Sequence, residues 1–313
     1  MMTFGRIFRV SVFGESHGPA TGVVLDGVPA GIALSAEDFK ADLDRRRSGA
    51  AGTTPRREAD VPEILSGVFD GHTCGSPLTI VFPNADTRPE DYASFREEPR
   101  PGHADYVAGI KYDGFNDPRG GGHFSGRLTL PVVAAGVVAK KYLAAVLEDQ
   151  FSIEASLKEV GGSADKGAWD SLLAAAAAEG DSLGGVVECR VGWLPVGLGE
   201  PFWDSVESTV SHAIFSIPGV RGIEFGDGFA AAAMKGSEHN DPFPLTPEKN
   251  GAGGVNGGIT NGNPLVFRVA FKPASSIRKG GVPGRHDVCI ALRTPVVVEA
   301  VTAIAIADFL RLV

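Results

Sequence analysis

The sequence predicts an α+β fold in which antiparallel sheets cover buried helices. Strand and helix segments alternate along the chain, most strand segments follow one another at hairpin-like spacing, and one long segment is apolar on almost every side. With 43% hydrophobic residues among 313, the chain can bury a substantial core. We find no repeat at a period of roughly 20–50 residues and no clear linker, so we expect a single domain over residues 1–313.

The first half of the chain should contain two strand pairs. Alternating segments rich in β-branched residues predict these strands, which are 7–13, 21–28, 63–69 and 78–82. Ser35 is a typical N-cap and Asp38 follows it, so a helix is expected to begin there and to end at residues 45–47. Residues 83–123 are rich in Pro, Gly, Asp and Arg with little periodicity, which predicts a long loop of the kind that often carries function.

The second half should contain two long apolar helices. Residues 128–147 form the first, which we expect in the core, and Thr294 with Pro295 predicts the N-cap and first turn of the second. Three charges interrupt this last segment and argue against a membrane span, namely Glu299, Asp308 and Arg311. Further expected elements are helices at 168–179 and 204–215, and strands at 185–191 and 265–271.

Charge and cysteine content exclude several classes of function. The chain has 29 Lys and Arg against 38 Asp and Glu, a formal net charge of −9, so neither nucleic acid nor an anionic membrane is an expected partner. Cys74, Cys189 and Cys289 lie far apart without a CxxC pair, which predicts free thiols, a reducing compartment and no structural metal. The N-terminus lacks a signal-peptide layout, and we therefore expect a cytoplasmic protein.

Three loop motifs place a histidine beside glycine. They are GESHG at 14–18, RPGHAD at 100–105 and GRHD at 284–287. A single histidine of this kind is most often structural or exposed. Three of them in glycine-containing loops favour a catalytic site, because loops carry function and glycine lets the backbone approach a ligand closely.

Arginines lie within or beside these motifs. Guanidinium groups bind carboxylate and phosphate in a two-pronged manner, so Arg100, Arg127 and Arg285 would suit a small polyanionic substrate. For Arg56 and Arg57, a solvated surface position and a functional one are equally compatible with the sequence. The glycine-rich run 120–127 opens the first apolar helix and is a candidate phosphate cradle. Neither a Rossmann GxGxxG motif nor a Walker motif is present.

Taken in order, the motifs along nearly the whole chain resemble those of the chorismate synthases. They are GESHG, LDRRRSG, TPRRE, ILSGVFDGHTCGSPL, RPGHADY, RGGGHFSGR, AAGVVAKKYL, GVRGIEFGDGF, GGVNGGITNG, FKPASSI and GRHDVCI. The resemblance implies a β-α-β sandwich with helices between antiparallel sheets, usually a homotetramer. It also implies an anti-1,4-elimination of phosphate from 5-enolpyruvylshikimate 3-phosphate to give chorismate, with reduced FMN (FMNH2) and no net redox change. NADPH would be a candidate reductant of the flavin.

The family pattern implies roles for residues at matching positions. His17 would protonate the departing phosphate, His103 would lie against the flavin N1 and C2 carbonyl, and Asp287 would sit near N5. The implied substrate-binding residues are Ser16, Arg46, Arg100, Arg127 and Arg285. The implied FMN-binding residues are His123, Phe124, Ser125, Pro218, Gly219, Gly257, Lys272, Pro273, Ala274, Ser275, Ser276 and Arg285.

Three segments depart from the family pattern. His123-Phe124-Ser125 stands where many relatives have Arg-Ser-Ser, Ala50-Ala51-Gly52 stands where another Arg is frequent, and the connection from Ile277 to Gly284 is shorter than usual. These departures leave open a non-catalytic relative that binds flavin or phosphate. A metal-dependent hydrolase is a second alternative, built on His17, His103, His286 and Asp287. The absence of HExxH or close His-x-His spacing counts against it.

Overall fold

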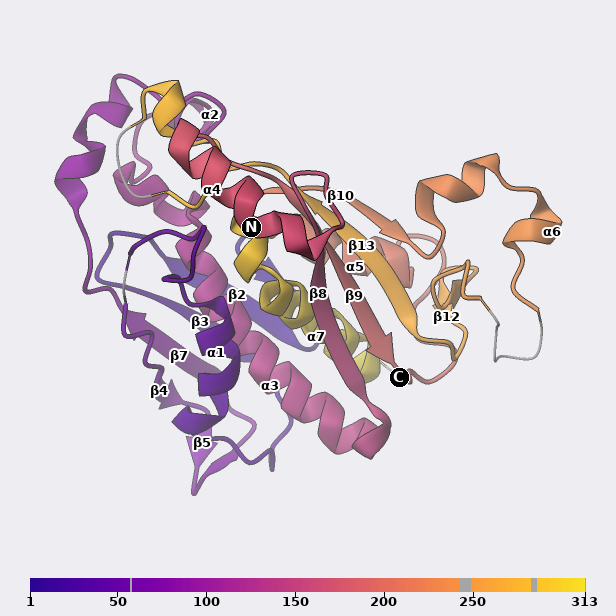
Figure 1. Cartoon of the computed structure of the whole chain (residues 1–313). Coiled ribbons are helices and arrows are strands. Elements are labelled where there is room, and N and C mark those ends of the chain that lie inside the picture. Colours follow the sequence, from indigo (N-terminus) through magenta and orange to yellow (C-terminus); the bar gives the residue numbers. More distant parts are fainter. Residues whose placement is uncertain (57, 243–248, 283–285, 313) are drawn as a thin grey trace.

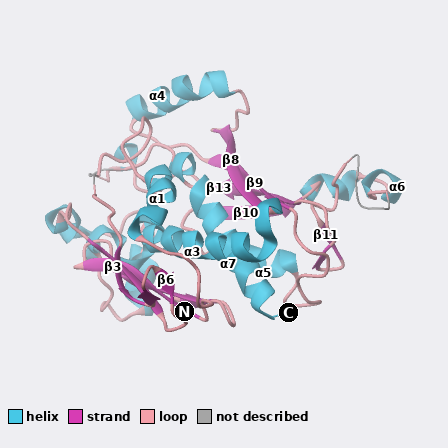
Figure 2. Cartoon of the chain, turned by 90° about the horizontal axis from the view of Figure 1, so that it is seen from below, coloured by secondary structure: helices cyan, strands magenta, loops and turns pink. Residues whose placement is uncertain are grey.

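Two antiparallel sheets enclose a layer of helices in the computed structural model, which describes residues 1–56, 58–242, 249–282 and 286–312 (Figures 1 and 2). The buried side chains of both sheets and of the helices between them form one hydrophobic cluster. This arrangement confirms the predicted α+β fold with buried helices.

The first sheet has five strands in the order β1-β2-β3-β7-β4. Their bounds are Thr3–Phe4 (β1), Arg9–Gly14 (β2), Ala20–Asp26 (β3), Leu78–Pro83 (β7) and Glu63–Ser66 (β4). Strands β2 and β3 form the predicted opening hairpin, in which Gly14 pairs with Thr21, so the GESHG motif lies at its turn. The predicted strand 63–69 is divided, because Val68–Phe69 (β5) pairs instead with His72–Thr73 (β6) in a separate ribbon.

The second sheet has four strands in the order β10-β13-β9-β8. Strands β9 (Gly185–Gly192) and β13 (Leu265–Phe271) lie at the predicted positions. Strands β8 (Ser152–Val160) and β10 (Val220–Phe225) were not predicted. Strand β8 is an edge strand in which Ile153, Ala155 and Leu157 alternate with exposed polar residues. This alternation could have revealed the strand, but its Ala, Lys and Glu residues have low β propensity.

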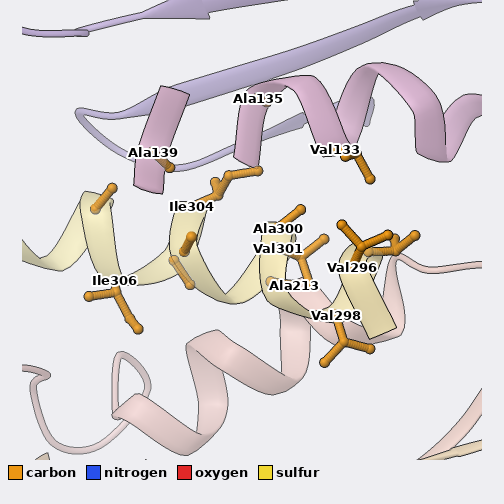
Figure 3. Close-up of a cluster of buried hydrophobic side chains, with 14 of the residues drawn as sticks. Val133, Ala135, Ala139, Ala213, Val296, Val298, Ala300, Val301, Ile304 and Ile306 are labelled. Atoms are coloured by element: carbon orange, nitrogen blue, oxygen red, sulfur yellow. The ribbon is translucent and has the colours of Figure 1, made fainter. Parts of the chain in front are cut away.

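Helices α3 (Thr129–Leu147) and α7 (Pro295–Leu312) cross between the sheets, and both begin close to where the sequence predicts. Figure 3 shows α7 lying between α3 and helix α5 (Val206–Phe215), with Ala135 and Ala139 on the side of α3 that faces α7. At the crossing, a side chain on Gly136 would lie 2.5 Å from the Cα atom of Ala300. Small residues therefore allow the two helices to approach closely.

The remaining helices agree with the predictions, except for those in residues 83–123 and for a short helix at 236–239, which the sequence did not predict. Helix α1 (Lys40–Arg46) follows a 3₁₀ turn capped by Ser35 and Asp38, and α4 (Trp169–Glu179) lies in its predicted range. The segment 83–123, predicted as a long loop, contains a 3₁₀ helix (Pro89–Arg96) and α2 (Asp105–Lys111). These helices are too short to show a clear hydrophobic period. The short α6 (Gly236–His239) projects from the body of the molecule (Figure 1).

The carboxylates that interrupt the apolar sequence of α7 bind groups from other elements. Glu299 accepts hydrogen bonds from three partners at 2.6–2.9 Å, which are Arg45, Lys140 and the backbone N–H of Ala155. Asp308 accepts hydrogen bonds from the backbone N–H groups of residues 6–8 at 2.8–3.0 Å. These buried charges tie α7 to the rest of the fold.

Among the described residues, one helical segment, Gly126–Leu147, has the length and apolar composition of a membrane span. However, 67% of its most apolar window is buried inside the protein. The segment fits the core helix that the sequence predicts.

Candidate active site

A cavity of about 720 Å³ lies where loops from both sheets meet the starts of α3 and α7. Most residues implied by the family resemblance line it, and they are Ser16, Arg46, Arg100, His103, His123, Phe124, Ser125, Arg127, Pro218, Gly219, Lys272, Pro273, Ala274, Ser275, Ser276 and Asp287. The volume is within the roughly 300–1,000 Å³ range of small-molecule sites. The fold therefore gathers distant motifs into one candidate site.

His17 follows Ser16 in the chain and lies against a turn of three glycines, but unlike Ser16 it is not among the described residues that line the cavity. Its Nδ1 is 3.2 Å from Ser16 Oγ, and its ring meets that of Tyr92 edge-on with centroids 4.8 Å apart. Gly120 has a φ of 59°, and a Cβ there would collide with the imidazole and lie 2.8 Å from Ser16 Oγ. Glycine at position 120 therefore lets the histidine loop approach the start of α3.

His103 is held by a carboxylate that also binds Arg100. The distance from His103 Nδ1 to Asp105 Oδ1 is 2.6 Å, and Arg100 donates to the same carboxylate through Nε at 2.7 Å and Nη2 at 2.8 Å. Burial raises the pKa of the Asp105 carboxyl, but hydrogen bonds from His103 and Arg100 outweigh it and hold that pKa well below its ordinary value. Arg100 also stacks on the ring of Phe95, 4.8 Å from its centroid. The three polar side chains thus form one braced unit at the cavity.

Arg127 and Arg46 share the buried carboxylate of Asp60. Arg127 Nη1 forms an ion pair with Asp60, its Nε donates to Asn84 Oδ1 at 3.1 Å, and Arg46 Nη1 lies 3.6 Å from Asp60. Burial and the positive charge of Arg293 lower the pKa of Arg46 to about 9, which leaves it cationic at neutral pH. Nη2 of Arg127 is buried and has no hydrogen-bond partner among the described residues. This donor is suited to an anionic ligand.

Arg56 lines the candidate site, whereas the sequence left a surface position and a functional one equally open for it. Its Nη1 donates to Ser16 Oγ at 3.0 Å, its Nη2 donates to the Ser16 carbonyl at 3.1 Å, and Glu58 binds the guanidinium at 2.7 Å. Arg56 lines the cavity, whereas Arg57 lies outside the described residues. Because Ser16 is 40 residues away in the chain, no local signal distinguished the two arginines.

The cavity wall contributed by the second sheet holds the residues expected to bind flavin. The Pro218-Gly219 turn joins α5 to β10, and the Gly219 carbonyl accepts a hydrogen bond from the Lys272 N–H at 2.9 Å. Ser275 Oγ donates to the Gly102 carbonyl at 2.8 Å, which ties this wall to the second histidine motif. Burial and the positive charge of Arg221 lower the pKa of Lys272. Arg221 also lines the cavity, although the motif that contains it, GVRGIEFGDGF, did not imply a site role for it.

Asp287 lines the cavity within an ion pair. Its oxygens accept hydrogen bonds from Arg293 at 2.7 and 3.1 Å, and Oδ1 also accepts the Thr54 N–H at 3.0 Å. Arg285 lies outside the described residues, so its binding role stays a prediction. Gly257 lies in the turn between β11 (Val255–Asn256) and β12 (Ile259–Thr260). It is not among the described residues that line the cavity. Its cofactor contact also stays a prediction.

The three departures from the family pattern have different structural settings. His123 lines the cavity and packs against Phe124 and Tyr112, with ring centroids 4.2 and 5.5 Å away. Gly52 has a φ of 81°, and its carbonyl accepts the backbone N–H groups of residues 288 and 289, so it supports the segment after Asp287. The described part of the short connection, 278–282, contributes none of the lining residues.

The hydrolase alternative requires a metal site, and residues 1–56, 58–242, 249–282 and 286–312 contain none. No group of three or more His, Cys, Asp or Glu side chains there could hold a metal ion. His103 and Asp287 are instead engaged by Asp105 and Arg293.

Comparisons with known proteins agree with this arrangement. The sequence model of the family described as chorismate synthase matches residues 8–311. A relative from Chitinophaga pinensis named chorismate synthase is 60% identical over 329 residues, which cover 100% of this chain and 97% of the relative. A relative of the same name from Korarchaeum cryptofilum is 45% identical over 97% of this chain and 96% of its own length. A crystal structure of chorismate synthase superposes with a TM-score of 0.77 at 28% identity, covering 98% of this chain and 92% of that one. The chain therefore belongs to the chorismate synthase family.

Proposed function

We propose that this protein catalyses the anti-1,4-elimination of phosphate from 5-enolpyruvylshikimate 3-phosphate to give chorismate, using reduced flavin without net redox change. It is then a carbon–oxygen lyase of the shikimate pathway, which serves aromatic amino acid biosynthesis. The observation that carries the proposal is the convergence of the His17 loop, His103 and several arginines on one cavity in a chain of this family. The same convergence favours catalysis over a non-catalytic relative.

The charges around the cavity suit this substrate, which carries a phosphate and two carboxylates. Four guanidinium groups line one region of the wall, and they belong to Arg46, Arg56, Arg100 and Arg127. Glu58, Asp60 and Asp105 neutralise part of this charge and hold the arginines in place. The unbonded Nη2 of Arg127 supports a role for this residue in substrate binding.

His17 is proposed to donate a proton to the departing phosphate. General acid catalysis of this kind contributes about 10²–10⁴ in rate. Two side chains fix the loop that carries His17. Arg56 donates hydrogen bonds to Ser16, and Asn84 Nδ2 donates to the carbonyls of residues 15 and 18. Asp287, held by Arg293 at the same cavity, is proposed to help pass on the proton that leaves the substrate.

FMN is the flavin that we propose, and the residues present fit it. The cations of Lys272 and Arg221 suit a phosphate, and Ile217, Pro218 and Val297 offer an apolar wall for a ring system. Residues of both flavin-binding segments, around Ser125 and Ser275, would hold the cofactor. When bound, reduced flavin would supply electron density to the substrate transiently, without net redox change. NADPH is the reductant that we propose to test.

We further propose a cytoplasmic homotetramer, as the family resemblance implies. Strongly exposed aromatic side chains support burial in an assembly, namely Phe202 (86% exposed), Trp203 (90%) and Phe229 (86%). The free cysteines are compatible with a reducing compartment. Light scattering coupled to size-exclusion chromatography measures the assembly directly.

The test is anaerobic turnover of 5-enolpyruvylshikimate 3-phosphate by purified protein with chemically reduced FMN. We expect release of phosphate and formation of chorismate, with no turnover when oxidised FMN replaces the reduced form. Adding NADPH to oxidised FMN shows whether the protein reduces its own flavin. Folded, flavin-loaded protein that forms no product would instead support the non-catalytic alternative.

A further inference from the structure

We infer that Asp105 is a positioning residue, which keeps the ring proton of His103 on Nδ1 and leaves Nε2 as the ring atom that meets the ligand. The family motif implies a role for His103 but not for the acidic residue two positions later. The kinetic consequence of this inference rests on the proposed function, whereas the position of the proton does not.

The geometry around Nδ1 decides which group donates. Nδ1 lies 2.6 Å from Asp105 Oδ1 and 3.1 Å from Arg100 Nη2. A guanidinium can only donate, and an ionised carboxylate can only accept. Arg100 Nη2 already donates to Asp105 Oδ1 at 2.8 Å, so the shorter contact identifies Nδ1–H as the donor to Asp105.

Asp105 is itself held firmly enough to act as an anchor. Arg100 binds it through two side-chain donors and through its backbone N–H at 3.1 Å. Arg100 in turn rests on Phe95 and reaches Ser276 Oγ at 3.3 Å. The carboxylate therefore has little freedom to follow a rotating imidazole.

The opposite edge of the ring faces the glycine turn. A Cβ on Gly121 would lie 3.1 Å from His103 Cε1 and 3.4 Å from Nε2, and Gly121 has a φ of 82°. A residue without a side chain thus leaves this edge open at the cavity that His103 lines. With the proton on Nδ1, Nε2 presents a lone pair there.

The physical reason for one tautomer is repulsion in the other. A proton on Nε2 would leave the Nδ1 lone pair against the Asp105 carboxylate at 2.6 Å. A carboxylate behind a catalytic histidine holds its tautomer and stabilises the ring when the far nitrogen takes up a proton. His17 differs, because its Nδ1 neighbours the Ser16 hydroxyl, which can donate or accept.

The experiment reads the tautomer without reference to turnover. Full-length protein labelled with ¹⁵N-histidine is examined by long-range ¹H–¹⁵N NMR, and His103→Gln identifies the His103 signals. We expect wild-type protein to show the proton on Nδ1, Asp105→Asn to show a mixture or the Nε2–H form, and Asp105→Glu to restore Nδ1–H. Asp113→Asn, an exposed carboxylate just beyond the other end of α2, is the control and should leave the spectrum unchanged.

Kinetics then separates positioning from binding. We expect Asp105→Asn to lower kcat by about 10² or more, with Asp105→Glu recovering part of the loss. An Nε2–H tautomer in wild-type protein overturns the inference, whether or not any variant folds. An unchanged tautomer in Asp105→Asn, with only substrate affinity lost, also overturns the inference. Asp105 would then position Arg100 and not His103. Wild-type protein without turnover contradicts the proposed function but leaves the tautomer result valid.

Discussion

The two central helices use buried charge in opposite ways. Helix α3 is preceded by a buried cation, Arg127, which lines the cavity and keeps one donor without a hydrogen-bond partner among the described residues. Helix α7 carries its buried charges inside the helix, at Glu299 and Asp308, and each of their carboxylate oxygens accepts at least one hydrogen bond.

The difference separates charges that serve the fold from charges that serve a ligand. A fully paired buried carboxylate joins elements, and removing it leaves its partners unsatisfied. A buried donor that is left open is costly unless a ligand completes it. By this criterion α7 is structural where it is charged, and the start of α3 belongs to the site.

The largest expected effect comes from breaking the structural charge. Glu299→Ala should lower the free energy of unfolding by about 3–5 kcal/mol, because Arg45, Lys140 and a backbone N–H lose their common partner. Denaturant titration measures the change. The exposed Glu179, paired with Lys279, is the control, and its replacement by Ala should change stability by less than about 0.5 kcal/mol. Equal losses of unfolding free energy at positions 299 and 179 would show that the buried Glu299 is no more structural than an exposed glutamate.

Replacing Arg127, the buried cation with one donor left unpaired by the described part of the chain, should affect turnover more than stability. Arg127→Lys should lower kcat/KM by about 10², equivalent to about 2.7 kcal/mol, because an ammonium cannot hold Asp60 and Asn84 and also present a two-pronged donor to the ligand. Steady-state kinetics and thermal unfolding are measured together.

Arg119→Lys is the matched control for Arg127, since Arg119 is half exposed and paired with Asp117. Its kcat/KM should stay within about twofold of the wild-type value. If Arg127→Lys unfolds much earlier while keeping wild-type kinetics, the start of α3 is as structural as α7.

A smaller effect is expected where the two helices touch. Gly136→Ala should destabilise the protein by about 1–3 kcal/mol, because the new methyl group would meet the backbone of Ala300. A methyl group on Gly109, inside α2, would project into open space, so Gly109→Ala should be neutral or stabilising by up to about 1 kcal/mol. Denaturant titration of both variants compares them, and a neutral Gly136→Ala would show that the crossing can widen freely.

The smallest effect is a dependence of stability on pH. Burial raises the pKa of Glu299, but hydrogen bonds from Arg45 and the charge of Lys140 outweigh it and hold that pKa below its ordinary value. The ionised carboxylate therefore stabilises the fold above the unfolded-state pKa of about 4.3, and this contribution is lost as pH falls through the folded-state value. We expect the stability difference between wild type and Glu299→Gln to hold steady above about pH 5 and to shrink as pH falls below it. A constant difference would argue that Glu299 is not the titrating group.

Local patterns in the sequence predicted most of the regular elements. The cap formed by Ser35 and Asp38, and the start of α7 at Thr294 and Pro295, depend on residues a few positions apart. Strand β8 was missed because edge strands keep one side in solvent and tolerate residues of low β propensity. Helix α2 was missed because two helical turns carry too little periodicity.

The motif series anticipated most residues that line the cavity but few of the partners that hold them. Arg56 binds Ser16 across 40 positions, and Arg127 binds Asp60 across 67. Even for His103 and Asp105, two positions apart, the sequence did not predict the hydrogen bond between them, because this contact depends on the backbone conformation of the loop.

By itself, the sequence determined the family, the order of the motifs and the two apolar helices, because these depend on residue identity and on spacing along the chain. Only the tertiary structure decided which charges are paired and which remain open, as Glu299 and Arg127 illustrate. The physical reason is that hydrogen-bond saturation depends on distances of about 3 Å between groups that are far apart in the chain.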